Sequence, residues 1–376
     1  MKKKLAIISA NADQIPLVKK AKEMGIETHC FAWDKEGYID CKGIADYFHP
    51  ISIFEKEQIL EKCKELKIDG ITSIVYDYAV PTVAYVAQNM GLTGNNYEDA
   101  LVHVNKYKAR ERFFQKGVSS PHFAVARKKE TPAMSGFKYP VIVKPTDCFA
   151  SRGVMKANSE KELKEALERA QNFSFSDEAI IEEFVTGAEV SVDSISWKGK
   201  HYIFGIRDKV TSGAPYFVEM AHHEPSQLSM ESIAKIENEA RKALDALNIR
   251  YGACDTEIKI TEDGEVYLIE VNARMGGDKS CELIGYTTGH DYLKIAVNVA
   301  LGYWEEPVIT HKYHTGVYFL SKECEWIKQI IENKDKYQEI AEAEITKEEL
   351  FPLQSSADRS GYFIYKSDKK KIWSDY

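Results

Sequence analysis

Two apolar segments joined by Asp263-Gly264 constrain the fold most strongly, because this dipeptide favours a two-residue β-hairpin turn. The segments are TEIKI (256–260) and EVYLIEV (265–271), and both have the composition of strands. A two-residue turn places Glu262 opposite Glu265 and fixes the pairing of the whole hairpin. One face of the hairpin is then predicted to form a core from Ile258, Ile260, Tyr267, Ile269 and Val271.

The same pairing places two carboxylates on the other face. Glu257 lies directly opposite Glu270, and Asn272 shares their face because side chains two apart on a strand point the same way. Facing carboxylates repel unless a positive charge lies between them. Two carboxylates and an amide oxygen suit Mg²⁺, which binds through oxygen ligands and substrate phosphates. The alternative is a solvent-exposed hairpin face on which water screens the repulsion.

Bulk composition excludes several classes of protein. A chain of 376 residues is too long for one ordinary core, so we expect two or three subdomains. A net charge of −8 speaks against nonspecific nucleic-acid binding, which needs a basic surface. The seven cysteines are scattered without a CxxC pair, which favours a reduced cytoplasmic setting and no disulfide framework. No segment is long and apolar enough to suggest a membrane span.

The first part of the chain alternates between strand-like and helix-like patterns, which predicts a doubly wound α/β sheet over about 1–95. We read MKKKLAIISA as the first strand, because its apolar run is too short for a signal peptide. The turn after it lacks the GxGxxG fingerprint of dinucleotide binding. Strands are predicted over 4–9, 26–34 and 68–77, and helices over 14–24, 51–66 and 80–90.

A second region mixes strands and helices with candidate phosphate ligands. Lys144 ends an apolar strand and precedes a loop of small residues, which resembles a phosphate-cradling turn. An ordinary surface loop is the alternative. The loop contains Ala150, Ser151, Arg152 and Gly153. Helices are predicted over 106–118, 159–171, 230–247 and 289–302, strands over 139–146 and 179–185, and a hairpin around Lys198-Gly199-Lys200.

Other candidates are weak when taken singly. Lys106 lies at the start of a helix, where a lysine is ordinarily solvated. Residues 183–185 offer backbone groups to a base and Glu189 a carboxylate to a diol, although an acidic strand end has the same pattern. His311 and His314 have metal-like spacing, but no third ligand is visible in the sequence.

Taken together, these residues have an order that resembles the ATP-grasp superfamily over about 1–310. The resemblance implies a Rossmann-like pre-ATP-grasp α/β domain followed by an α+β ATP-grasp fold. The implied boundaries are 1–104 for the N-terminal domain, 105–190 for the small lid subdomain, 191–310 for the large catalytic subdomain, and 311–376 for a C-terminal α/β segment.

The resemblance also implies a role for each motif. ATP would bind between the two subdomains, with its phosphates at Lys106, Lys144, Ser151, Arg152 and Gly153. Adenine and ribose would be held by Glu182, Glu183, Phe184, Val185 and Glu189. Mg²⁺, or Mn²⁺ in its place, would bind Glu257, Glu270 and Asn272. Arg274 and Lys144 would be catalytic. The loop departs from the family pattern at Cys148 and Phe149, where Phe149 would either cover the nucleotide or hinder closure.

Within the superfamily, segment 214–228 and the sequence EVNARMGGD are most similar to L-amino-acid ligases. By this similarity Glu219 and His222 would line the amino-acid pocket, although His222-His223 also fits a partly exposed loop. Arg274, Gly276 and Gly277 would hold a carboxylate. Asp278 would shape the second-substrate pocket and favour a cationic or amino-bearing group.

The implied activity is that of an ATP-dependent carboxylate–amine ligase, which forms an amide through an acylphosphate and releases ADP and phosphate. Its partners would be small-molecule carboxylates and amines, and neither nucleic acid nor a membrane is expected. The resemblance to the family also allows a homodimer. Two alternatives remain: a carboxylase-type ATP-grasp enzyme that uses bicarbonate, and a non-catalytic nucleotide-binding protein.

Overall fold

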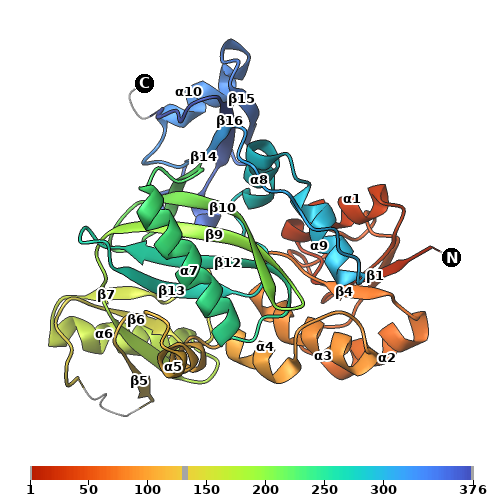
Figure 1. Cartoon of the computed structure of the whole chain (residues 1–376), viewed down its shortest axis with the longest axis horizontal. Helices are drawn as coiled ribbons and strands as arrows, with labels where there is room; N and C mark the ends of the chain where they lie inside the picture. The colour runs from red at the N-terminus through yellow and green to blue at the C-terminus, as the bar shows by residue number, and fades with distance from the viewer. Residues whose placement is uncertain (1, 129–133, 374–376) are drawn as a thin grey trace.

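The structure is a computed structural model, and it describes residues 2–128 and 134–373 (Figure 1). The ends of the predicted N-terminal domain and C-terminal segment, residue 1 and residues 374–376, lie outside the described residues, as do residues 129–133 of the predicted lid. The described residues form three sheets. In that part of the chain, no helix combines the length and apolar character needed to cross a bilayer.

The N-terminal sheet is parallel and has the strand order β3-β2-β1-β4, as a doubly wound pattern predicts. The alternating pattern missed the short strand β3, and helix α2 begins five residues later than predicted, after a turn closed by Glu55 and Ser52. The strands are β1 (Lys4–Ile8), β2 (Glu27–Phe31), β3 (Tyr47–His49) and β4 (Gly70–Thr72). The helices are α1 (Ile15–Glu23), α2 (Lys56–Leu66), α3 (Val80–Met90) and α4 (Tyr97–His103).

A smaller antiparallel sheet has the order β5-β8-β6-β7 and carries the predicted phosphate loop between β6 and β7. Ser159 caps helix α6 by accepting a hydrogen bond from the backbone of Glu162, as the sequence predicts. The strands are β5 (Phe123–Arg127), β6 (Val141–Pro145), β7 (Met155–Ala157) and β8 (Glu178–Glu183), and the helices are α5 (Lys106–Lys116) and α6 (Glu160–Phe173).

The large sheet has eight strands in the order β13-β12-β9-β10-β11-β14-β16-β15, so the C-terminal strands extend the sheet that carries the central hairpins. Helix α7 lies across one face of it (Figure 1). The strands are β9 (Ala188–Trp197), β10 (Lys200–Thr211), β11 (Glu219–Glu224), β12 (Tyr251–Ile260), β13 (Val266–Asn272), β14 (His314–Leu320), β15 (Ile340–Ile345) and β16 (Gly361–Ser367). The helices are α7 (Met230–Ala246), α8 (Ser280–Thr288), α9 (Tyr292–Ala300) and α10 (Trp326–Glu332).

The β12–β13 hairpin confirms the central pairing but corrects the turn. Glu257 does lie opposite Glu270, yet nearer the turn Ile258 pairs with Leu268, so the register shifts by one residue. Thr261 and Glu265 close the loop, which is therefore one residue longer than the predicted turn. The extra loop residue is offset by a β-bulge at Ile269.

The bulge also corrects the predicted core. Inserting one residue reverses which face the following side chains occupy, so Val266 and Leu268 are buried in place of Tyr267 and Ile269. Ile258, Ile260 and Val271 lie in the core as predicted. Ile269 instead lines the cavity described below.

Candidate active site

A cavity of about 290 Å³ lies where the three sheets meet. Most of the predicted site residues line it, although they come from segments far apart in the sequence. Those that line it are Lys106, Lys144, Ser151, Glu182, Glu183, Phe184, Val185, Glu189, Glu219, His222, Glu257, Glu270, Asn272, Arg274, Gly277 and Asp278. Arg152, Gly153 and Gly276 are not among the lining residues, and His311 lies elsewhere, against the backbone oxygen of Phe204.

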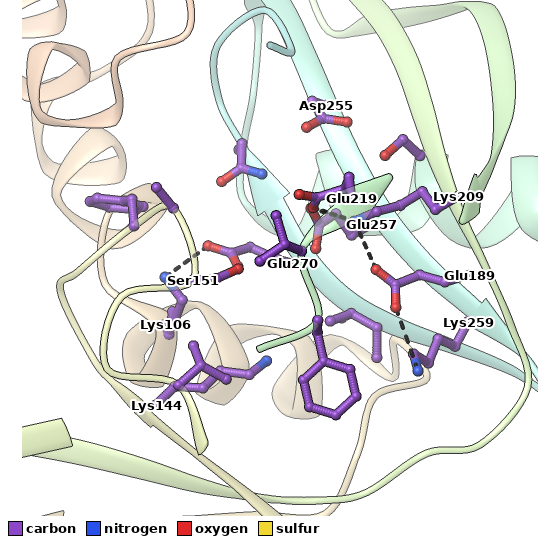
Figure 2. Close-up of a pocket in the computed structure, with 18 of the residues that line it drawn as sticks. Lys106, Lys144, Ser151, Glu189, Lys209, Glu219, Asp255, Glu257, Lys259 and Glu270 are labelled. Carbon is purple, nitrogen blue, oxygen red and sulfur yellow. Dashed lines mark hydrogen bonds and ion pairs between the residues drawn. The ribbon is translucent and has the colours of Figure 1, made fainter. Parts of the chain in front are cut away.

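One wall of the cavity carries the two predicted phosphate lysines (Figure 2). Lys106 is held at the start of α5, where its Nζ lies 2.9 Å from Glu270 Oε1 and donates to the backbone oxygen of Cys148 at 2.7 Å. Lys144, near the end of β6, lies 2.8 Å from Glu182. Both side chains are only 12% exposed, so the solvated-helix alternative for Lys106 is wrong.

The opposite wall carries a lysine that the sequence analysis missed. Lys209 on β10 is 3% exposed and lies among Glu189 (2.8 Å), Glu257 (3.1 Å) and Glu219 (3.4 Å). Although burial opposes its charge, these three carboxylates raise the pKa of Lys209 well above its usual value. A signal was available, because Arg207 and Lys209 lie two residues apart on the second strand of a predicted hairpin and therefore share a face.

The predicted adenine and ribose residues lie at the lid end of the cavity. The backbone oxygen of Val185 accepts a hydrogen bond from Lys259 at 3.3 Å, and Lys156 lies 4.0 Å from the ring centre of Phe184. Glu189 is within 3.5 Å of Lys259. Glu182 is buried between Arg110 and Lys144, so its carboxylate is already neutralised by two cations.

The predicted metal ligands lie between the two lysine walls. Glu257 and Glu270 face each other across β12 and β13, and Asn272 is two residues further along β13. Burial raises the pKa of Glu257 to about 7 despite Lys209, whereas Lys106 and Lys144 outweigh burial and lower the pKa of Glu270. The side chains of Glu257 and Glu270 are only 23% and 20% exposed and line a cavity, so this face of the hairpin is not the solvent-exposed surface considered above.

Within residues 2–128 and 134–373, no cluster of three or more His, Cys, Asp and Glu side chains is arranged to hold a metal ion. Mg²⁺ does not require one, because it commonly binds through one or two carboxylates plus the phosphates of its substrate. The oxygen donors Glu257, Glu270 and Asn272 therefore fit an ion that arrives with a nucleotide.

Arg274 lines the cavity beyond the carboxylates and is fixed from the N-terminal domain. Its guanidinium donates to both oxygens of Asp77, at 3.0 and 3.1 Å, and lies 3.5 Å from Asp255. Val75, close to Asp77 in sequence, donates from its backbone to the oxygen of Met275. The N-terminal domain thus supplies part of the site.

The far end of the cavity contains the predicted amino-acid pocket. His222 and His223 are buried in strand β11, which corrects the partly exposed loop considered as an alternative. His222 Nε2 lies 3.1 Å from Asp278, and Arg359 from the C-terminal segment approaches the same carboxylate at 2.5 and 3.3 Å. Asp278, which the sequence places in the second-substrate pocket, therefore already has Arg359 and His222 as partners.

The loop between β6 and β7 folds over the first lysine wall. The ring of Phe149 lies 4.5 Å from Lys106 Nζ and packs edge-on against Tyr78. Arg152 does not line the cavity and donates to the Tyr78 hydroxyl at 3.1 Å. Gly153 has a φ of +77°, and a side chain there would collide with Pro145 and Phe173.

Comparison with known proteins agrees with this geometry. The profile of the ATP-grasp domain matches residues 137–282. The D-alanine–D-alanine ligase of Geobacter sulfurreducens is 32% identical over 202 residues, which cover 52% of this chain and 63% of that protein. The alanine–anticapsin ligase of Bacillus subtilis is 26% identical over 298 residues, covering 69% of this chain and 62% of that protein. The chain thus spans less than two thirds of the length of these relatives.

Solved structures extend the likeness to the whole fold. The L-amino acid ligase of Bacillus licheniformis superposes with a TM-score of 0.81 at 24% identity, covering 100% of this chain and 95% of that one. Phosphoribosylglycinamide synthetase from Anaerococcus prevotii superposes with a TM-score of 0.75 at 24% identity, covering 98% and 95% of the two chains. The fold is therefore that of the ATP-grasp proteins, and residues 137–282 match the ATP-grasp domain.

Proposed function

We propose that this protein is an ATP-dependent carboxylate–amine ligase that activates an amino acid as an acylphosphate and joins it to an amine. One observation carries the proposal. A single cavity places lysines on two walls with the carboxylates Glu257 and Glu270 between them (Figure 2), and Asn272, Arg274 and the Glu219–His222–Asp278 pocket line the same cavity. This arrangement suits a nucleotide triphosphate whose last phosphate meets a second substrate at Arg274.

The proposed reaction needs no protein nucleophile. An oxygen of the substrate carboxylate attacks the γ-phosphorus, and the bond to the β,γ-bridging oxygen breaks to release ADP. The amine nitrogen then attacks the acyl carbon, forms the amide bond, loses a proton and expels phosphate. Lys106, Lys144 and Lys209 would hold the phosphates, and Arg274 would stabilise the negative charge that develops on the oxygens in both steps.

Mg²⁺, when bound, would neutralise phosphate charge, with Glu257, Glu270 and Asn272 as its protein ligands. Lys106 and Lys209 now neutralise the two carboxylates. On nucleotide binding we expect both lysines to turn from the carboxylates to the phosphates. The four domain boundaries given above, with the nucleotide between the lid and the large subdomain, belong to the same proposal.

The relatives support an amino-acid substrate, since those named above include enzymes that join alanine to a second component. The bicarbonate alternative has a fold neighbour in the biotin carboxylase domain of Hydrogenobacter thermophilus, solved with a bicarbonate anion, which superposes with a TM-score of 0.73 at 18% identity, covering 98% of this chain and 87% of that one. We favour the amino acid because His222, Glu219 and Asp278 form a polar pocket beside Arg274 that bicarbonate would not need.

ADP release, measured across pairs of amino acids and with bicarbonate, tests the proposal. We expect release that requires ATP, Mg²⁺ and an amino acid. Release with bicarbonate alone would favour the carboxylase, and tight ATP binding without release would favour a nucleotide-binding protein. Glu270→Gln should abolish release, whereas Glu265→Gln, an exposed acid just before the same strand, should not. Near-normal activity of Glu270→Gln would contradict the metal assignment.

A further inference from the structure

An ion pair from the C-terminal segment closes the amino-acid end of the cavity. Arg359 lies just before strand β16, and its guanidinium reaches Asp278 through both terminal nitrogens. One of these nitrogens also lies 3.1 Å from Glu219 Oε2. Asp278 and Glu219 line the cavity, whereas Arg359 lies behind them with its side chain 9% exposed. Arg359 therefore acts on the pocket through these two carboxylates.

The guanidinium is held firmly in this position. Its central carbon lies 3.9 Å from the ring centre of Phe319 on strand β14, which is cation–π geometry. The preceding turn is locked because Asp358 accepts hydrogen bonds from the backbone and hydroxyl of Ser355. The following residue, Ser360, is buried and donates from its backbone to Leu320. Arg359 is thus fixed on both sides in sequence and by the ring beneath it.

Both acids at this end of the pocket have cationic partners. Both oxygens of Asp278 have partners, one in Arg359 and one shared between Arg359 and His222. Glu219 divides its oxygens between Lys209 and Arg359. Burial lowers the pKa of His222 although Asp278 opposes this, so His222 is neutral at pH 7 and adds no charge. A charged side chain placed beside Asp278 would meet no unpaired countercharge.

We infer that Arg359 is a specificity-determining residue that masks Asp278 and restricts the second-substrate pocket to amino acids with uncharged side chains. The inference rests on the proposed ligase function, and it replaces the expectation that Asp278 attracts a cationic group. Desolvating a charged side chain without a partner is costly, so the balanced pair rejects both lysine and aspartate. Removing one member of the pair should expose the charge of the other.

Two substitutions with opposite expected outcomes test this. Arg359→Met keeps the length and the packing on Phe319 but exposes Asp278, so kcat/KM for lysine relative to alanine should rise by about tenfold or more. Asp278→Asn exposes Arg359, so the corresponding ratio for aspartate should rise instead. The double variant should return to a preference for alanine. Arg359→Lys, which retains the charge, should keep both ratios within about threefold of wild type.

Binding measurements separate this inference from the proposed function. The same amino acids are titrated calorimetrically into each variant in the presence of Mg²⁺ and a non-hydrolysable ATP analogue. If the wild-type protein releases ADP but neither variant changes its preference among the amino acids, the proposed role of Arg359 is wrong. If the variants show the expected changes in amino-acid affinity but the wild-type protein releases no ADP, the role of Arg359 is supported and the proposed ligase activity is contradicted. If Arg359→Met does not fold, Asp278→Asn decides alone.

Discussion

Asp77 of the N-terminal domain binds the guanidinium of Arg274 through both carboxylate oxygens, at 3.0 and 3.1 Å. The two residues are 197 positions apart, and both side chains are at most 14% exposed. Burial raises the pKa of Asp77, and the charge and hydrogen bonds of Arg274 oppose this rise. Arg274, which we place at the transferred phosphate, is therefore oriented by a residue of the N-terminal domain.

Asp77→Asn should lower kcat by roughly 10- to 100-fold, because a misplaced catalytic group loses much of its effect. The dissociation constant for ADP should stay within about twofold, since Asp77 is not proposed to contact the nucleotide. Asp34→Asn, which breaks an exposed pair with Lys42, is the control and should leave kcat unchanged. Steady-state kinetics with calorimetric ADP binding would check this, and an unaltered kcat would contradict the positioning role.

Lys209→Met should destabilise the fold by about 3–5 kcal/mol, because it leaves Glu189, Glu219 and Glu257 without their shared cation. Lys235→Met removes a partner of Glu231 on the surface of α7 and should change the free energy of unfolding by less than about 0.5 kcal/mol. Urea unfolding compares the two variants. A loss below about 1 kcal/mol for Lys209→Met would show that the carboxylates find other partners.

The buried carboxyl group of Glu224 should make the stability of the fold depend on pH. It is 1% exposed, and burial raises its pKa to about 8 from an ordinary value of 4.5. Between these values the folded protein keeps a proton that the unfolded chain releases, so stability falls as pH rises from about 4.5 to about 8. A tenfold difference in proton affinity corresponds to about 1.4 kcal/mol, so Glu224 contributes several kcal/mol to this fall.

Glu224→Gln should flatten this dependence, because glutamine preserves the shape without titrating. The free energy of unfolding in urea, measured at pH 5.5 and pH 8, should fall less in the variant than in wild type. Some fall should persist, since burial also raises the pKa of Asp193 to about 7 despite Arg207. An equal fall in both proteins would show that Glu224 is ionised throughout.

Phe149→Ala should raise ATP hydrolysis relative to amide formation, because Phe149 covers Lys106 and keeps water from the phosphate wall. Phe114→Ala is the control, since Phe114 is 76% exposed on α5 and does not line the cavity. The ratio of ADP released to amide formed would report the effect. A ratio unchanged from wild type would mean that Phe149 does not protect the site.

Much of the fold follows from local patterns in the sequence. Strand–helix alternation predicts the N-terminal sheet, and the Lys198-Gly199 turn predicts the β9–β10 hairpin. The facing carboxylates Glu257 and Glu270 were predicted correctly although the turn was not. The loop is one residue longer than predicted, and a β-bulge restores the predicted pairing beyond it. The alternation of apolar and polar residues contains no signal for either feature.

The site was less predictable where its residues meet across long separations. Arg359 and Asp278 are 81 residues apart, and a lone arginine in a loop resembles a solvated surface residue. Asp77, which contacts Arg274, was equally hard to identify as a site residue from the sequence. The motif residues were identified by their order along the chain, whereas these partners are defined only by the packing of the C-terminal strands and of the N-terminal domain against the large sheet.

Transfer of oxygen from the substrate carboxylate to phosphate tests the central claim most directly. An amino acid labelled with oxygen-18 in its carboxylate is incubated with the protein, ATP, Mg²⁺ and an amine. The account predicts one labelled oxygen in each phosphate released, because the carboxylate oxygen that attacks the γ-phosphorus leaves with it. Unlabelled phosphate, released together with ADP while the amide forms, would contradict an acylphosphate and with it the proposed mechanism.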